Sequence, residues 1–284
     1  MAVHPREPPL RPCLSDLLAL IPPGPPLILR DGDRIVLAEQ ALEGLMRAEA
    51  YRRTEPMHCR VPVADIHSDT DERIDQLLHG EAFDVLHRQG ERGQMRVWGR
   101  ARRDGVVGWV ALDLLSPGAS LPARRVASVT AALPLNALVG EGGEGLSDAD
   151  LQPVGDFERE PVAVAERLLG RPHALGARSS FETDCSGLVQ QALLACGLPG
   201  PRRSDAQADL GRPIARDAAQ RGDLVVWMAP NRDHDWTGHS AIMVDADQVI
   251  HATGAHGGVV IEALAEVEAR LTGEGFASAV FRRI

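Results

Sequence analysis

The sequence of 284 residues predicts an α+β protein in which a small all-β barrel precedes a mixed domain of helices and strands. Two patterns indicate this. Residues 60–115 contain short runs of alternating apolar and polar residues separated by glycine turns, which is typical of a small barrel. From residue 160 onward the pattern is helical at first and then gives a series of short strands, which indicates an α+β domain.

Composition and net charge indicate which kinds of binding partner this protein can have. With 44% hydrophobic and 25% charged residues, the chain is an ordinary globular protein. Its net charge of -10 disfavours nucleic acid or an anionic membrane as a partner, because both require clustered basic residues. The first residues lack a basic segment followed by an apolar one, and the apolar residues 17–21 are too short to cross a bilayer. We therefore expect a cytoplasmic protein; the sequence predicts no oligomeric state.

Three segments precede the mixed domain. Residues 1–57 are proline-rich and then helical, because the apolar residues of 37–50 fall on one helical stripe. Residues 58–117 form the barrel, with a hairpin turn at Arg103-Asp104-Gly105. Its strands are expected at 60–64, 82–87, 95–102 and 106–112. Residues 118–159 are too short for a complete second barrel, so we expect a truncated one, with the main linker in the glycine-rich run 139–145.

Residues 160–284 form the mixed domain. Its expected helices are 162–169, 184–196 and 262–270, and its expected strands are 223–228, 240–244, 249–252 and 259–261.

Cys185 is the candidate nucleophile among four cysteines whose irregular spacing fits neither a disulfide framework nor a CxxC metal site. Thr183 or Asp184 can cap the helix, which places Cys185 in its first turn. There the macrodipole and the free backbone N–H groups favour a thiolate. Cys196 lies in the last turn and is interpreted as a small buried apolar residue. Alone, Cys185 would be interpreted in the same way, because free cysteines are often buried.

Two histidines change this interpretation. His239 begins one expected strand and His251 lies on the next, so a hairpin centred near Asp245 places them across from each other. A base held by a neighbouring polar side chain is what a weak nucleophile requires. A cysteine at a helix start together with two paired histidines therefore predicts a catalytic site.

These residues resemble the signature of the NlpC/P60 family of papain-like cysteine peptidases. The similar stretches are Asp184-Cys185-Ser186-Gly187, Gly222-Asp223-Leu224, His239 and His251, and the resemblance covers about residues 160–284. Residues 75–86 and 104–110 of the expected barrel resemble bacterial SH3-like (SH3b) domains. The fold class implied is a papain-like NlpC/P60 domain preceded by an SH3-like barrel and a truncated second barrel.

The resemblance implies the roles of the site residues. Cys185 would be the nucleophile, His239 the general base and acid, and His251 the residue that orients His239. Substrate contacts are implied for Asp184, Ser186, His173, Arg203 and Ser204, with Asp184 binding the free amine of a terminal L-Ala. No metal and no organic cofactor is implied. The implied substrate is a murein peptide cut between D-Glu and a diamino acid, and the expected cytoplasmic location suggests peptide recycling.

The sequence departs from the family pattern ahead of the helix. Relatives have a Tyr-x-Trp-Gly-Gly stretch where this chain has His173, Leu175, Gly176 and Ala177, and Tyr51 is the one tyrosine of the whole chain. The substrate is therefore open, as is the choice between diaminopimelate and lysine. Two other functions also stay open: a binding protein without turnover, and an acyltransferase that uses the same cysteine and histidine.

The helix-start position predicts that Cys185 reacts with iodoacetamide near neutral pH far faster than Cys13, Cys59 or Cys196. Substitution His239→Ala is expected to slow this reaction. Mass spectrometry of alkylated peptides measures all four rates, and four equal rates would contradict the assignment of Cys185 as nucleophile.

Overall fold

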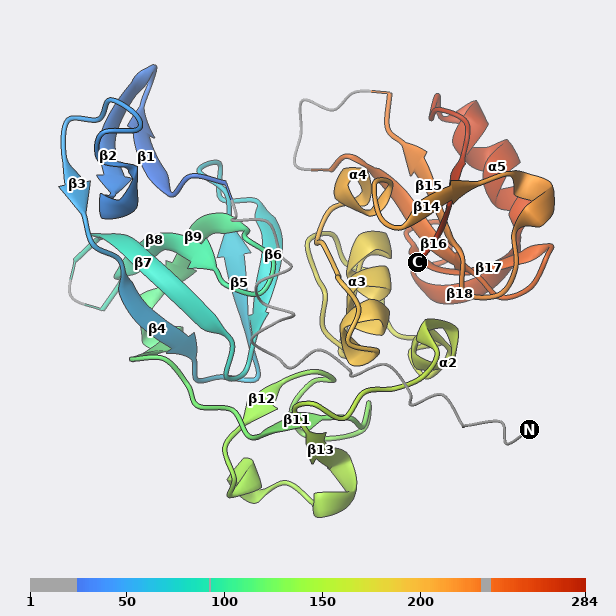
Figure 1. Ribbon diagram of the computed structural model, residues 1–284, viewed down its shortest axis with the longest axis horizontal. Coiled ribbons are helices and arrows are strands. Elements are labelled where there is room, and N and C mark those ends of the chain that lie inside the picture. Colours follow the sequence, from blue (N-terminus) through green and yellow to red (C-terminus); the bar gives the residue numbers. More distant parts are fainter. Residues whose placement is uncertain (1–24, 92, 231–235) are drawn as a thin grey trace, which may run out of the picture.

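The computed structural model describes residues 25–284 except Arg92 and residues 231–235. Cys13 and most of the proline-rich start therefore lie outside the described residues. Figure 1 shows a β-rich half, formed by the earlier part of the chain, beside a mixed half formed by the later part. The expected α+β class is confirmed. Among the helices of the described residues, none has the length and apolar character needed to cross a membrane.

The segment expected to be helical over 37–50 is instead a small sheet, so that prediction was wrong. Its strands are β1 (Ile28–Asp31), β2 (Arg34–Glu39) and β3 (Tyr51–Arg52), with a short 3-10 turn between β2 and β3. The turn between β1 and β2 contains Gly32 with a φ of 59°, a conformation that glycine adopts readily. A buried helical stripe would have required Leu45 to be covered, yet that side chain is 80% exposed.

The barrel domain is one antiparallel sheet in the order β10-β4-β7-β8-β9-β5-β6. Its strands are β4 (Glu55–Cys59), β5 (Val63–His67), β6 (Arg73–Leu78), β7 (Ala82–Gln89), β8 (Arg96–Ala101), β9 (Val107–Ala111) and β10 (Leu115–Pro117). The predicted hairpin turn is confirmed, since β8 pairs with β9 and Gly105 has a φ of 83°. The expected strand 60–64 was wrong, because residues 60–62 connect β4 to β5.

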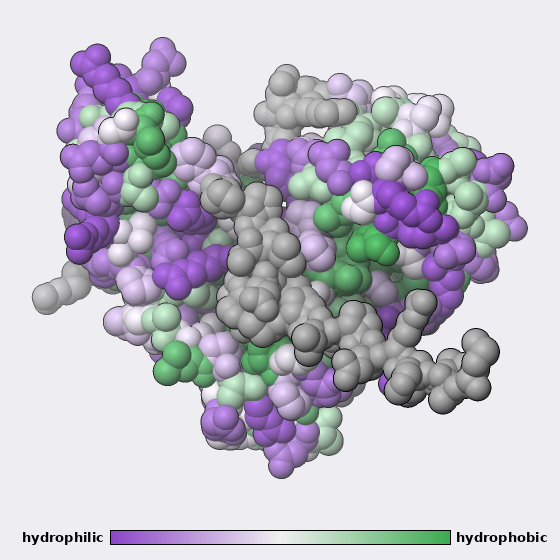
Figure 2. All heavy atoms as spheres, viewed as in Figure 1, coloured by the Kyte–Doolittle hydropathy of each residue, from purple (hydrophilic) through white to green (hydrophobic). Residues whose placement is uncertain are grey.

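Two tryptophans explain why the first sheet covers the barrel. The rings of Trp98 and Trp109 lie 5.3 Å apart and pack with Leu27 and Leu37 of the first sheet region. Trp98 Nε1 also donates to the carbonyl oxygen of Ile28 at 2.8 Å. Both indoles are therefore core residues. On the face shown in Figure 2, the visible surface of this half is largely hydrophilic.

Residues 118–159 form a three-stranded unit that contacts both halves. Strands β11 (Arg124–Val126), β12 (Leu138–Val139) and β13 (Leu151–Pro153) pair in the order β12-β11-β13. Their apolar side chains pack with Leu78 of the barrel. On the other side, Asn136 Nδ2 donates to the carbonyl oxygen of Gln191 at 3.0 Å.

The C-terminal domain is an antiparallel sheet between helices, in the order β14-β19-β15-β16-β17-β18. The strands are β14 (Arg212–Ile214), β15 (Leu224–Met228), β16 (Gly238–Met243), β17 (Gln248–Thr253), β18 (Gly258–Ala263) and β19 (Val280–Arg283). The helices are α2 (Pro161–Glu166), α3 (Cys185–Ala195), α4 (Ser204–Gln207) and α5 (Leu264–Gly273). Apolar residues of α2 and α3 pack in one cluster with Ile242 and Ile250, and those of α5 in another with Val225 and Trp227. The helix expected from residue 262 begins at Leu264, and Glu262 lies on β18.

Two buried arginines of the C-terminal domain hold it against the barrel. Arg178 donates from Nε to the carbonyl oxygen of Gln76 at 2.7 Å, and its guanidinium pairs with Glu81. Arg202 donates from Nε to Asp75 Oδ1 at 2.6 Å. Because an unpaired charge is costly in a protein interior, these ion pairs fix the barrel and the C-terminal domain in one relative position.

Substitution Arg178→Met is expected to lower the free energy of unfolding by about 3–5 kcal/mol, because it leaves buried carboxylates without their cation. The matched control is Arg88→Met, since the Arg88–Glu55 pair lies on the barrel surface. That change is expected to cost less than about 1 kcal/mol. Urea unfolding followed by tryptophan fluorescence measures both variants, and equally small shifts would contradict a structural role for Arg178.

Candidate active site

The start of α3 positions Cys185. Asp184 caps the helix, with its Oδ1 accepting from the backbone N–H of Gly187 at 2.7 Å. Gly187 packs closely against the preceding loop, where an added Cβ would lie only 2.4 Å from the carbonyl oxygen of Ala177. The Asp-Cys-Ser-Gly stretch therefore needs its glycine for a close approach of backbone. Cys185 is 3% exposed, and its Sγ lies 3.8 Å from the carbonyl oxygen of Gly238, the residue before His239.

The two histidines form a hydrogen-bonded pair. His239 Nε2 lies 2.7 Å from His251 Nδ1, and both side chains are buried. The strands pair as Ile242↔Ile250, and continuing this register places His251 diagonally from His239 on the same face of the sheet. The expected hairpin is therefore present, but its register is one residue from that centred on Asp245. Diagonal neighbours on one sheet face are still within reach of long side chains.

Burial opposes the expected thiolate. Burial and the Asp184 carboxylate raise the pKa of Cys185 to about 12, so the effect of the helix start is outweighed. Burial and neighbouring charges, with His251 first among them, hold the pKa of His239 well below its usual range. The resting pair is therefore a neutral thiol with a neutral imidazole. A nucleophilic thiolate then requires proton transfer to a base, which makes the iodoacetamide reaction of Cys185 depend on His239 rather than on the helix alone.

Glu262 extends the chain of hydrogen bonds and was missed in the sequence. Its Oε2 lies 2.7 Å from His251 Nε2, and Arg270 of α5 donates to both of its carboxylate oxygens. Assigning residue 262 to a helix concealed this contact. The register could have shown it: a turn over 254–257 places Glu262 opposite Val249 and therefore diagonal to His251.

Asp184 and Ser186, two of the implied substrate-binding residues, are already engaged with Arg202. Both oxygens of the Asp184 carboxylate accept from Arg202, at 3.0 and 2.6 Å. Ser186 Oγ accepts from the same guanidinium at 2.9 Å. Binding of a substrate amine by Asp184 stays a prediction, and the amine would have to compete with this arginine.

The other implied substrate residues lie in different surroundings. Ser204 is buried and donates to the carbonyl oxygen of Gly238, the first residue of β16, at 3.1 Å. His173 is partly buried, and its backbone forms a β-bridge with Thr183, two residues before Cys185. Arg203 is more exposed and forms an ion pair with Asp205 at 3.6 Å. Leu175, at the position of the family tryptophan, is 61% exposed.

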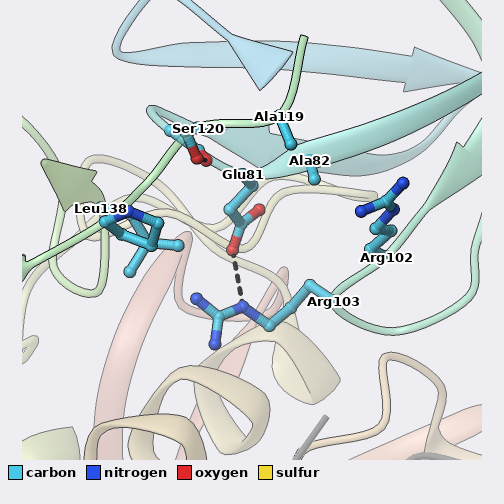
Figure 3. A pocket seen from close by; sticks show the side chains of 9 residues that line it. Glu81, Ala82, Arg102, Arg103, Ala119, Ser120 and Leu138 are labelled. Atoms are coloured by element: carbon cyan, nitrogen blue, oxygen red, sulfur yellow. Dashed lines mark hydrogen bonds and ion pairs between the residues drawn. The ribbon is translucent and has the colours of Figure 1, made fainter. Parts of the chain in front are cut away.

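A hollow of about 390 Å³ lies elsewhere, between the barrel and residues 119–138 (Figure 3). Arg102 and Arg103 line it, but Arg102 is bidentate to Asp84 and Arg103 donates to Glu81 at 3.1 Å. The two cations are thus paired within the barrel, so this hollow offers no better candidate site than the region of Cys185.

The buried histidines predict a stability that depends on pH. Burial lowers the pKa of His251 from 6.5 to about 4. Between these values the unfolded chain binds more protons than the folded protein, so the free energy of unfolding is expected to decrease as the pH falls through this window. Urea unfolding at several pH values measures the slope. Substitution His251→Asn is expected to reduce it, and an unchanged slope would contradict a buried neutral His251.

The amino-acid sequence matches two known families. Residues 170–271 match the NlpC/P60 family, and residues 68–115 match the bacterial dipeptidyl-peptidase Sh3 domain. The chain is 32% identical over 106 residues to a probable endopeptidase of Corynebacterium glutamicum (strain R), which is 37% of this chain and 47% of that protein. It is 31% identical over 98 residues to the murein DD-endopeptidase MepS/murein LD-carboxypeptidase of Escherichia coli (strain K12), which is 34% of this chain and 50% of that protein. The matches thus span about half the length of these curated relatives.

The fold is also similar to a solved structure. An NlpC/P60 family protein from Bacillus cereus ATCC 10987 aligns over 80% of this chain and 99% of its own, with a TM-score of 0.63 and 18% identity. At this identity the likeness concerns the fold alone. The two sequence matches identify residues 170–271 as an NlpC/P60 domain, preceded by a bacterial SH3 domain over residues 68–115.

Proposed function

We propose that this protein is a cysteine peptidase that hydrolyses murein peptides. The observation that carries the proposal is the 2.7 Å contact between His239 and His251 next to a buried cysteine at a helix start. A nucleophile, a base and a residue that orients the base are the parts that acyl transfer to cysteine requires. The NlpC/P60 match and the relatives named as endopeptidases support the same reaction class.

The reaction has two steps. His239 takes the proton of the Cys185 thiol as Sγ attacks the substrate carbonyl carbon, and backbone N–H groups at the start of α3 stabilise the oxyanion. The C–N bond then breaks, His239 returns the proton to the leaving amine, and a thioester remains on Cys185. Water, deprotonated by His239, then attacks the thioester carbonyl; the C–S bond breaks, the carboxylic acid is released, and His239 returns the proton to the Cys185 sulfur. Neither step needs a metal or an organic cofactor.

The substrate we propose is a γ-D-glutamyl-diamino acid peptide, as the family resemblance implies. Because Asp184 is held by Arg202, and because His173 and Leu175 replace the aromatic residues of relatives, we expect a free N-terminal amine to contribute less to binding here. The role in murein recycling and the cytoplasmic location stay predictions from the sequence.

Mass spectrometry of products from L-Ala-γ-D-Glu-diaminopimelate tests the proposal, with the N-acetylated peptide as a second substrate. The wild type is expected to release L-Ala-D-Glu and its acetylated form at similar rates. Substitution Cys185→Ala is expected to abolish both reactions, whereas Cys196→Ala, at the other end of α3, is the matched control that keeps them.

Three results would change the proposal. Release from the free peptide alone would restore amine recognition by Asp184. New amide products in the presence of an added amine would indicate acyl transfer. If neither peptide gives a product while Cys185 still reacts with iodoacetamide, the proposed substrate class is wrong.

A further inference from the structure

We propose that Glu262 is a positioning residue that fixes the tautomers of His251 and His239, so that His239 keeps Nδ1 unprotonated for the Cys185 thiol. The catalytic effect of this role rests on the proposed function. The tautomers themselves belong to the resting protein and can be measured without a substrate.

The contacts define a linear chain of groups from Arg270 on α5 to His239. Arg270 donates from Nη1 and Nη2 to the two oxygens of Glu262, each at 2.9 Å. Glu262 Oε2 lies 2.7 Å from His251 Nε2, and His251 Nδ1 lies 2.7 Å from His239 Nε2. His239 Nε2 is therefore committed to His251, and His251 Nε2 to Glu262.

The charge of Glu262 sets the direction of these hydrogen bonds. Hydrogen bonds from Arg270 lower the pKa of Glu262 to about 2, and His256 adds a contact at 3.1 Å. An ionised carboxylate can only accept hydrogen bonds. His251 must therefore carry its proton on Nε2, and as a neutral ring it has a bare Nδ1. That nitrogen accepts from His239, so His239 carries its proton on Nε2 and has its bare nitrogen at Nδ1.

The opposite tautomers would leave the site without a base. If His251 carried its proton on Nδ1, it would donate to His239 Nε2, and a neutral His239 would then hold its proton on Nδ1. The nitrogen available to the thiol would be protonated and could not accept the Cys185 proton. Because the wrong tautomer of an orienting histidine removes general-base catalysis, the carboxylate matters through orientation as well as through charge.

A simple surface ion pair would not explain these contacts. His251 is completely buried, so its Nε2 would be a buried polar atom without a partner if Glu262 were absent. Among the described residues, the Glu262 carboxylate is the hydrogen-bond partner of that nitrogen. Arg270 and His256 are partly exposed, so water can replace Glu262 as their hydrogen-bond partner. The buried His251 depends on this carboxylate.

Histidine NMR of the ¹⁵N-labelled full chain tests the tautomers directly. The wild type is expected to show His239 and His251 protonated on Nε2. Substitution Glu262→Gln is expected to give a second tautomer, because an amide can either accept or donate. Glu266→Gln is the matched control: it removes the same charge from the exposed face of α5 and should leave both tautomers unchanged.

Either of two spectra would overturn the role of Glu262: a wild-type His239 protonated on Nδ1, or tautomers that do not change in Glu262→Gln. If Glu262→Gln does not fold, the wild-type spectrum alone decides.

Kinetics then tests the catalytic consequence. In Glu262→Gln, kcat is expected to fall about 10- to 100-fold with little change in KM. The acid limb of kcat/KM should move to lower pH, because removing the negative charge lowers the pKa of His239, which His173, His251 and Arg270 already lower. An unmoved acid limb would overturn the positioning role. A wild type that cuts no murein peptide but shows the stated tautomers would instead overturn the proposed function.

Discussion

The structure depends on the ion pairs that Arg178 and Arg202 make across the boundary between the barrel and the NlpC/P60 domain. Both guanidinium groups are buried, and their carboxylate partners come from the barrel on one side and from Asp184 on the other. Burial of charge stabilises a protein little by itself, but removing one partner is expensive. The contact between the domains is therefore specific: an altered orientation would leave several charges buried without partners.

This contact extends to the nucleophile. Asp75 of the barrel holds Arg202, Arg202 holds both oxygens of Asp184, and Asp184 caps the helix that begins with Cys185. A second connection joins Arg73 of β6 to the carbonyl oxygen of Leu175, in the loop ahead of that helix. The barrel thus positions the cysteine through two consecutive ion pairs and one helix-cap hydrogen bond. In this chain the barrel therefore supports the structure of the candidate site.

The sequence was most informative where a local pattern decides the outcome. The cap at Asp184, the turn at Gly105 and the strand that begins near His239 follow from residues close in the chain, and all three are present. Long-range packing decided the rest. Residues 37–50 were wrongly expected to be helical because Leu37 packs against Trp98 and Trp109 of the barrel, which no local pattern encodes. Glu262 was missed for a related reason, since its role depends on the register between β17 and β18. The pKa of Cys185 also depends on burial, which composition and spacing do not reveal.

A carboxylate and an arginine act in opposite directions on both the cysteine and the histidine base. Near Cys185, the Asp184 carboxylate raises the pKa of the thiol and Arg202 lowers it. Near His239, Glu262 raises the pKa of the imidazole and Arg270 lowers it. Burial is the largest cause at both groups, and His251 further lowers the pKa of His239, so the resting thiol and imidazole are neutral. A nucleophilic sulfur therefore requires transfer of the Cys185 proton to His239 as the sulfur attacks its electrophile. Such a site holds its cysteine as a thiol between turnovers, and the hydrogen-bonded histidines keep a base ready for the moment of attack.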